Sequence, residues 1–330
     1  MSKDLLKSGI QLRGDALISV ENHELSILSH EKLSFKDLDQ DEEALVFSLR
    51  KGISAESINS AINTDRKKKI VNLLHSNGLL KPFVDSNTLN TRFGRQIDWL
   101  SHFSSQPLEM QNNLATRKVL ILGCGGTGCI IAEHLLRAGI LNFTLVDGAQ
   151  LDICDLNRQL AYNENDLGQD KSSLLAKKLL SIDSTAHVKA IQSMIENEEW
   201  IEKLLISEKP DLLINCADTP TAYIHAWVSG ACEKINAPLL LGGVGLKEGS
   251  IGPLLLSSES KLKYRDQMLQ AAQNLSSSQN IMKASLSFTN SLTSILLAFE
   301  AFKFLSGFSE PLKDGDIKNV NFFSIGESLS

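Results

Sequence analysis

The chain has 330 residues, 42% of them hydrophobic and 22% charged, which is the composition of a soluble globular protein of about two domains. It contains no run of about 20 apolar residues that could span a membrane, and its first residues lack the apolar core of a secretory signal. We therefore expect a cytoplasmic protein without a membrane partner. The net charge of −6 disfavours nucleic acid as a partner, because counterion release requires a basic surface.

The N-terminal 80 residues show short apolar runs followed by helical patterns. The apolar runs, which turn-forming residues separate as they would separate small strands, lie at 10–12, 16–20 and 25–27. The helical patterns lie at 43–49, 54–62 and 65–75. This order predicts a winged-helix-like domain over residues 1–80.

The role of this domain has two plain interpretations. It can be a dimerisation or accessory domain, or it can be a DNA-binding winged helix, which the basic run Arg66-Lys67-Lys68-Lys69 would favour. Such a run is most often a solvated helix face, and the acidic character of the whole chain disfavours DNA.

The rest of the chain has a different texture. Residues 81–116 are rich in Asn, Ser and Thr and predict a connecting arm. Beyond them, continuous apolar runs alternate with helical patterns, which predicts an α/β domain with a Rossmann-like, mostly parallel sheet over residues 117–330. The expected strands are 118–122, 143–146, 212–215 and 239–241, and the expected helices are 129–137, 172–180 and 221–234.

A glycine-rich turn follows the first of these strands and directly precedes a helix. Its glycines, which permit a tight turn and let backbone N–H groups approach a phosphate, are Gly123, Gly125, Gly126 and Gly128. Asp147 ends the next strand, at the spacing where an acidic side chain hydrogen-bonds a ribose hydroxyl. The pattern predicts a nucleotide site, and up to this point an NAD-linked oxidoreductase fits equally well.

Two cations beyond the ribose position favour a nucleotide triphosphate. Arg158 and Lys171 are expected to neutralise phosphate oxygens, which hydride transfer does not require; the alternative is that both are surface charges. Asp218 follows the strand 212–215 at the edge of the sheet where ligands bind. It is expected to hold Mg²⁺, and the alternative is a helix N-cap for the segment that begins near Thr221.

The ordered motifs resemble the ThiF/MoeB/HesA and ubiquitin-activating superfamily over roughly residues 92–325. The matching motifs are the glycine turn, Val146-Asp147, Leu156-Asn157-Arg158-Gln159, Asp166-x-Gly168-x-x-Lys171 and Ala217-Asp218. The resemblance implies adenylation, in which a carboxylate attacks the α-phosphate of ATP-Mg²⁺.

The same resemblance implies a role for each site residue. Arg158, Lys171 and Arg95 would stabilise the phosphates, with Asp218 on the metal, Asp147 on the ribose and Gln159 as an orienting group. Arg95 lies in Arg92-Phe93-Gly94-Arg95-Gln96, which resembles the arm motif whose second arginine reaches the partner subunit, so a homodimer is implied; a solvated charge is the alternative. Asp155 stands where the family usually has Asn, and it adds a negative charge that metal or arginine would have to compensate.

The cysteines bear on the fate of the adenylate. The five cysteines form no C-x-x-C pair and none follows Cys232, so we expect reduced thiols, no zinc and no thiol relay. The N-terminal domain resembles the peptide-clamp domain of microcin C-type enzymes, which implies a ribosomally made precursor peptide as partner. The absence of zinc pairs and of a relay cysteine is similar to the pattern of pantocin-type enzymes, in which precursor glutamates are cyclised. The glutamate side chains of the partner peptide would be activated for cyclisation in peptide-antibiotic biosynthesis. The alternatives are activation of a ubiquitin-like sulfur carrier and a non-catalytic peptide-binding scaffold.

Overall fold

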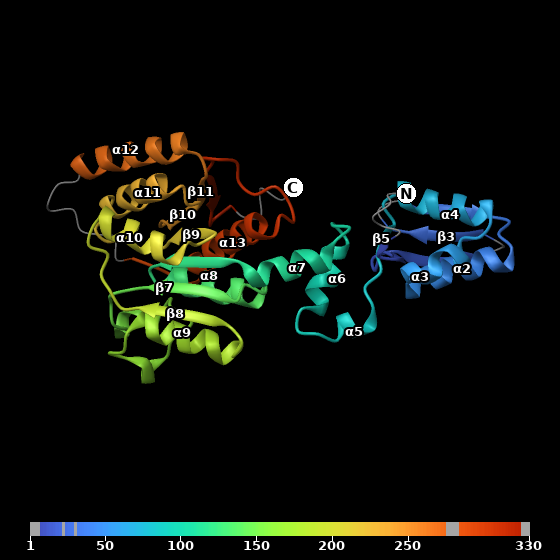
Figure 1. The fold of residues 1–330 in the computed structure, drawn as a ribbon, viewed down its shortest axis with the longest axis horizontal. Helices are drawn as coiled ribbons and strands as arrows, with labels where there is room; N and C mark the ends of the chain where they lie inside the picture. Colours follow the sequence, from blue (N-terminus) through green and yellow to red (C-terminus); the bar gives the residue numbers. More distant parts are fainter. Residues whose placement is uncertain (1–6, 22–23, 30–31, 275–283, 325–330) are drawn as a thin grey trace. The chain divides into compact units, whose positions relative to one another are not determined.

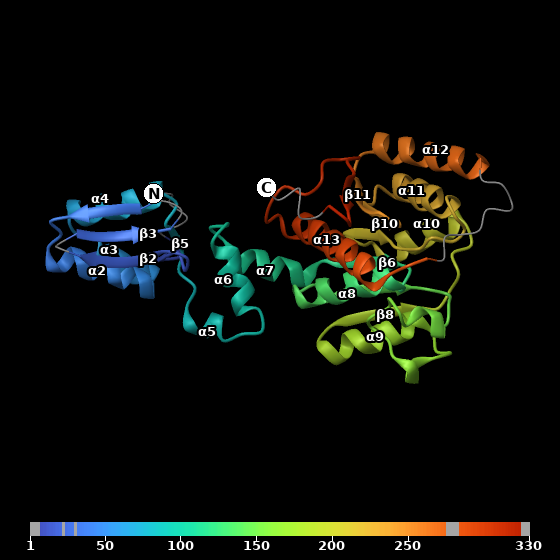
Figure 2. The same cartoon turned by 180° about the vertical axis from the view of Figure 1, so that it is seen from behind.

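The computed structural model describes residues 7–21, 24–29, 32–274 and 284–324. The chain divides into two compact units, Met1–Gln111 and Asn112–Ser330. Figure 1 and, from behind, Figure 2 show the elements of each unit. None of the helices in these described ranges is long and apolar enough to cross a membrane.

Within the described part of residues 1–82, the N-terminal unit holds two small antiparallel sheets and the helices α2, α3 and α4. One sheet has the order β2-β3-β4 and the other pairs β1 with β5. The strands are β1 (Ile10–Leu12), β2 (Leu17–Glu21), β3 (Glu24–Leu28), β4 (Lys32–Lys36) and β5 (Leu80–Pro82). The helices are α2 (Gln40–Lys51), α3 (Ala55–Ala61) and α4 (Asp65–Ser76).

Local sequence explains how α2 begins. Asp39 accepts a hydrogen bond from the backbone N–H of Glu42 (2.8 Å), and the Glu42 carboxylate accepts one from the N–H of Asp39 (3.0 Å). This capping box satisfies two donors that the helix itself cannot pair. Arg66 of α4 then forms an ion pair with the buried Glu42 carboxylate (2.9 Å), so the cap also connects two helices.

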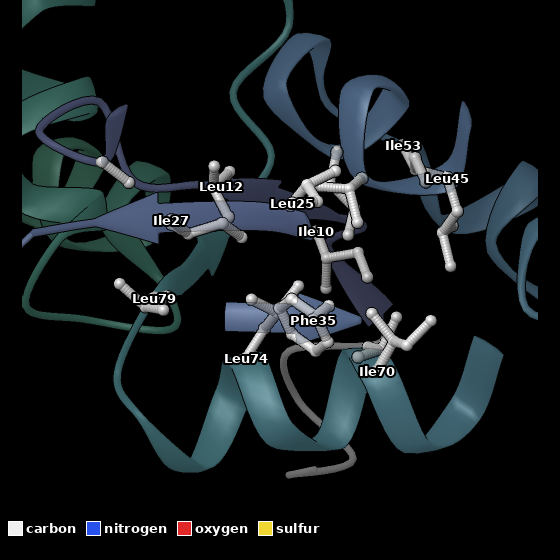
Figure 3. Packing of buried hydrophobic residues seen from close by; sticks show 14 of the residues in the cluster. Ile10, Leu12, Leu25, Ile27, Phe35, Leu45, Ile53, Ile70, Leu74 and Leu79 are labelled. Atoms are coloured by element: carbon white, nitrogen blue, oxygen red, sulfur yellow. The ribbon is translucent and has the colours of Figure 1, made fainter. Parts of the chain in front are cut away.

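The core of this unit joins alternate strand residues to the inner faces of the helices (Figure 3). Leu25 and Ile27 of β3 point to the same side because side chains alternate along a strand. They pack with residues from α4 such as Ile70 and Leu74, and all four are at most 6% exposed. The alternating runs of the sequence therefore bury one face of a small sheet.

The stretch 81–116, which was expected to be a connecting arm, is mostly helical. It contains α5 (Ser86–Leu89), α6 (Gly94–Ser101) and α7 (Pro107–Thr116). Within α6 the apolar residues Ile97 and Leu100 are buried. The sequence pattern did not predict these helices, because the stretch is rich in Asn, Ser and Thr, which are also common in loops.

The C-terminal unit is built on a seven-stranded sheet with the order β12-β11-β10-β9-β6-β7-β8. The strands are β6 (Lys118–Leu122), β7 (Asn142–Val146), β8 (His187–Ile191), β9 (Leu212–Asn215), β10 (Leu239–Val244), β11 (Glu248–Leu255) and β12 (Lys318–Asn321). Strands β10, β9, β6, β7 and β8 run parallel to one another. Strand β11 pairs antiparallel with β10, and β12 pairs antiparallel with β11. The expected α/β class with a mostly parallel sheet is confirmed.

Helices cover both faces of this sheet. Helices α10, α11 and α12 form one layer, and α8 and α13 pack together on the other (Figures 1 and 2). Their bounds are α8 (Gly126–Arg137), α9 (Lys171–Ile182), α10 (Glu198–Glu208), α11 (Tyr223–Ile235), α12 (Ser258–Asn274) and α13 (Ser287–Ser306). Strand β6 pairs with β7 on one side and with β9 on the other, so the order of the strands reverses there. Ligands of doubly wound sheets bind at the carboxyl ends of the strands at such a point.

Candidate functional site

The glycine turn lies at the carboxyl end of β6, at this reversal point. Gly123 has φ +88°, and a Cβ added there would lie 2.7 Å from the carbonyl carbon of Cys216 and 2.8 Å from the nitrogen of Ala217. A Cβ at Gly128 would lie 1.9 Å from the oxygen of Gly123. Only glycine therefore fits at these two positions, and the turn lies directly against the backbone that follows β9.

The first turn of α8 leaves backbone N–H groups available. Its N-cap is Gly125, which has no side-chain cap hydrogen bond. A Cβ at Gly125 would lie 3.5 Å from Nε2 of Gln159, and one at Gly126 would lie 2.8 Å from Oδ1 of Asn290. The helix start thus lies beside two polar side chains that come from distant parts of the sequence, and a helix N-terminus of this kind favours anions.

Asp147 follows β7 and connects to the glycine turn. Its Oδ2 accepts a hydrogen bond from the backbone N–H of Cys124 (2.7 Å), and its Oδ1 accepts one from the N–H of Ala149 (2.8 Å). Each carboxylate oxygen keeps a second acceptor position. The carboxylate can therefore accept a further hydrogen bond from a hydroxyl group while the backbone holds it in place.

Arg158 and Lys171 meet at one buried carboxylate. The Arg158 guanidinium lies 3.1 Å from Oδ1 of Asp155, and Nζ of Lys171 lies 2.8 Å from Oδ2. Nε2 of Gln159 also donates to Oδ1 of Asp155 (2.7 Å). Asp155 and Lys171 are 5% and 9% exposed. The structure thus brings together two predicted cations that lie 13 positions apart in the sequence.

Asp218 lies in the loop after β9 with its side chain exposed, and it accepts a hydrogen bond from Oγ1 of Thr219 (3.1 Å). The helix-cap alternative is wrong, because the N-cap of α11 is Ala222 and has no side-chain cap hydrogen bond. Among the described residues there is no group of three or more His, Cys, Asp or Glu side chains that could hold a metal ion. Mg²⁺ at Asp218 would therefore take most of its oxygen ligands from phosphate and water, as Mg²⁺ sites in nucleotide-binding proteins usually do.

Arg95 lies in the first turn of α6, in the N-terminal unit, and is exposed. Its reach to the phosphates of a partner subunit stays a prediction.

Two side chains of the site were missed as site residues by the sequence reasoning. The hydroxyl oxygen of Tyr162 lies 2.7 Å from the carbonyl oxygen of Cys124 and 3.2 Å from that of Lys171, and burial raises the pKa of this phenol. Asn290, at the start of α13, lies against Gly126. Tyr162 carries no sequence signal beyond an aromatic residue in a polar segment, whereas Asn290 lies in the Thr-Asn-Ser run that opens the last long helix.

The cysteines are free, and those nearest the sheet are poor nucleophiles. Burial raises the pKa of Cys129 to about 11, and that of Cys216 and Cys232 to about 12. The pKa of the exposed Cys154 is also raised, first by its hydrogen bond with Asp152. These four thiols are protonated at neutral pH, whereas nucleophilic attack requires the thiolate.

The fold and the site define a doubly wound α/β protein with a glycine turn at the point where the strand order reverses and with two cations beside it, the buried Lys171 and the partly buried Arg158. The chain belongs to the ThiF family, whose model matches residues 93–327. The predicted family membership is confirmed.

Curated relatives match about half of the chain. It is 30% identical over 160 residues to a probable molybdopterin-synthase adenylyltransferase of Porphyra purpurea, which covers 48% of this chain and 40% of that protein. It is 32% identical over 177 residues to the adenylyltransferase and sulfurtransferase MOCS3 of Dictyostelium discoideum, which covers 52% and 39%. The chain thus spans less than half the length of these relatives.

Two solved structures share the fold over most of the chain. E. coli MccB with AMPCPP and MccA superposes with a TM-score of 0.71 at 21% identity, covering 95% of this chain and 96% of that one. PaaA superposes with a TM-score of 0.63 at 20% identity, covering 78% and 88%.

Proposed function

We propose that this protein is an ATP-dependent adenylating enzyme that activates a carboxylate on a ribosomally made precursor peptide. The observation that carries the proposal is the convergence of Arg158 and Lys171 on one carboxylate, 3.1 and 2.8 Å away, beside the glycine turn. Two cations that already share an anion form a receptor for phosphate oxygens. The names of the curated relatives, which are adenylyltransferases, support the same reaction.

The reaction joins the substrate carboxylate to the α-phosphorus of ATP. A carboxylate oxygen forms the new P–O bond, the bond to the bridging oxygen of the β-phosphate breaks, and pyrophosphate leaves with the electron pair. Backbone N–H groups of the glycine turn would hold the phosphates, and Asp147 would accept a hydrogen bond from a ribose hydroxyl. Arg158 and Lys171 would stabilise the charge that develops on the phosphate oxygens, and Gln159 would orient the cluster. Mg²⁺ at Asp218 would neutralise further phosphate charge.

The N-terminal unit would recognise the peptide. Its three-stranded sheet has the order β2-β3-β4, so one side of β2 and one side of β4 have no strand partner among the described residues. An extended peptide can add to such an edge, where backbone hydrogen bonds provide affinity. The similar folds of MccB, which was solved with MccA, and of PaaA support this assignment. We further propose that glutamate side chains are activated and then attacked by a nucleophile within the same bound peptide.

A homodimer would complete the site with Arg95 of the second copy. Helix α13 supports an assembly of this kind, because Phe288, Ile295 and Phe299 lie seven and then four positions apart and share one helix face. They are 80%, 43% and 43% exposed. An apolar stripe of this type on a helix is suited to burial against another chain.

Peptide-dependent exchange of labelled pyrophosphate into ATP tests the reaction. We expect exchange with the cognate precursor peptide and a loss of at least about a hundredfold in R158A, because a charged donor to the transition state is removed. The matched control is R137A on α8, where Arg137 is exposed and pairs only with Glu133 among the described contacts. Exchange without any peptide, or equal exchange in R158A and R137A, would refute the proposal.

Activation of a ubiquitin-like sulfur carrier is the second candidate, favoured by the names of the curated relatives. Adenylate formation on a carrier protein that ends in Gly-Gly, with none on the peptide, would select it. Peptide binding with no exchange of any kind would instead indicate a non-catalytic scaffold.

A further inference from the structure

Asp155 is surrounded by donors from the protein itself. Its Oδ1 accepts hydrogen bonds from Arg158 (3.1 Å) and Gln159 (2.7 Å). Its Oδ2 accepts from Lys171 (2.8 Å) and from the backbone N–H of Asp152 (3.1 Å). A carboxylate offers about four acceptor positions. All of them are filled, so Asp155 can contact a ligand only by giving up one of these partners.

Lys171 requires an anion when the site holds no nucleotide. The residue is 9% exposed, and its ammonium group forms an ion pair with Asp155. A buried ammonium without a counter-ion is strongly unfavourable, because it loses its hydration and gains nothing in return. In the free protein Asp155 therefore neutralises the charge of Lys171, as a phosphate would in the complex with nucleotide.

The side chain of Gln159 also responds to the charge at position 155. Its side chain is 2% exposed, and its Nε2 donates to Asp155 (2.7 Å). Its Oε1 is buried and has no hydrogen-bond partner in the described part of the chain. The amide cannot turn over, because its oxygen would then face a carboxylate. The charge at position 155 therefore fixes the orientation of Gln159, and its buried Oε1 stays without a partner in the described part of the chain.

We propose that Asp155 is an internal counter-ion that stands in for phosphate on Arg158 and Lys171 and competes with ATP for them. The inference rests on the proposed binding of ATP at this site. Asp155 stabilises the protein with an empty site and, because it carries the same sign of charge as the phosphates that approach its partners, it lowers the affinity for ATP.

The substitution D155N tests both consequences, with D170N as the matched control. Asp170 directly precedes Lys171, but its carboxylate contacts Gln150 and Gln192 and not the two cations. Both substitutions remove one negative charge, at positions that lie 15 residues apart in the sequence. By titration calorimetry we expect D155N to lower the Kd for ATP about tenfold and to leave the Kd for adenosine, which lacks phosphates, unchanged. D170N should change neither value more than about twofold.

Thermal unfolding without nucleotide provides the second readout. D155N should unfold at a clearly lower temperature than the wild-type protein and D170N, since Lys171 then lacks its ion-pair partner. The double variant D155N/K171M should recover much of this loss, because no buried cation remains unpaired. If D155N does not fold alone, folding of the double variant supports the inference, and its failure to fold overturns it.

The outcomes separate this inference from the proposed function. If the wild-type protein binds no ATP, the proposed function fails, and the unfolding temperatures still test the pairing of Asp155 with Lys171. If the wild-type protein binds ATP and D155N binds it equally or more weakly, the counter-ion role is wrong while the proposed function stands.

Discussion

The glycine at position 128 offers the sharpest test of how the turn is packed. A Cβ at this position would lie 1.9 Å from the oxygen of Gly123, 3.0 Å from its carbonyl carbon and 3.3 Å from Cγ2 of Ile121. The nearest atoms belong to backbone, which no rotamer change can move away. G128A therefore requires the start of α8 and the end of β6 to separate by more than about 1 Å, because contacts below roughly 3.2 Å are repulsive.

We expect G128A to lose at least about 3 kcal/mol of stability, above the usual range for one extra methyl group in a well-packed core. For a folding unit of this size that corresponds to a fall of roughly 6–12 °C in Tm. The control is G125A, in which the Cβ would lie 3.5 Å from Nε2 of Gln159, an ordinary contact. G125A should lose less than about 1 kcal/mol, the difference between Gly and Ala at an N-cap.

Differential scanning calorimetry and urea unfolding, both without nucleotide, measure the two variants. Equal Tm values for G128A and the wild-type protein, or equal losses in G128A and G125A, would refute the packing argument. A loss of nucleotide binding in both variants with a stability loss only in G128A would separate the structural glycine from the ligand-facing one.

Three further predictions concern the buried thiols, the metal and the helix cap. The pKa of the Cys232 thiol is raised by burial to about 12 from 9.0, so the unfolded chain loses this proton first and stability falls above pH 9. At pH 10, one unit above the pKa of the unfolded chain, this difference lowers the free energy of unfolding by about 1.4 kcal/mol. C232A should remove that much of the stability loss between pH 8 and 10, as measured by urea unfolding at each pH. The same pH dependence in C232A and the wild-type protein would contradict the prediction. D218N should raise the Mg²⁺ concentration for half-maximal exchange at least about tenfold with Tm unchanged, since the side chain is exposed; an unaltered Mg²⁺ dependence would remove Asp218 from the metal site. D39A should cost about 1 kcal/mol through loss of the capping box with Glu42, measured by urea unfolding, and a loss below about 0.3 kcal/mol would show that the cap is dispensable.

Much of the fold was accessible from the sequence because its signals are local. The expected helices 65–75 and 129–137 lie within α4 and α8, and the expected strands 118–122 and 143–146 lie within β6 and β7. Burial periodicity and caps act over a few residues, so a short segment carries them. The sequence pattern did not predict the strands β4 and β5, because they are short and have few apolar residues. It did not predict the helices of 81–116, because their polar residues are also common in loops.

The candidate site divides in the same way. The glycine turn and Asp147 were predictable, because a strand, a turn and a helix in succession impose their own spacing. The pairing of Arg158 and Lys171 with Asp155, and the contact of Asn290 with Gly126, depend on loops and helices that meet only after the sheet has formed. The sequence alone therefore determined which residue types could hold a nucleotide. Only the tertiary structure decided that Arg158 and Lys171 already form ion pairs with Asp155. Side chains from separate segments converge only when the sheet order brings those segments together.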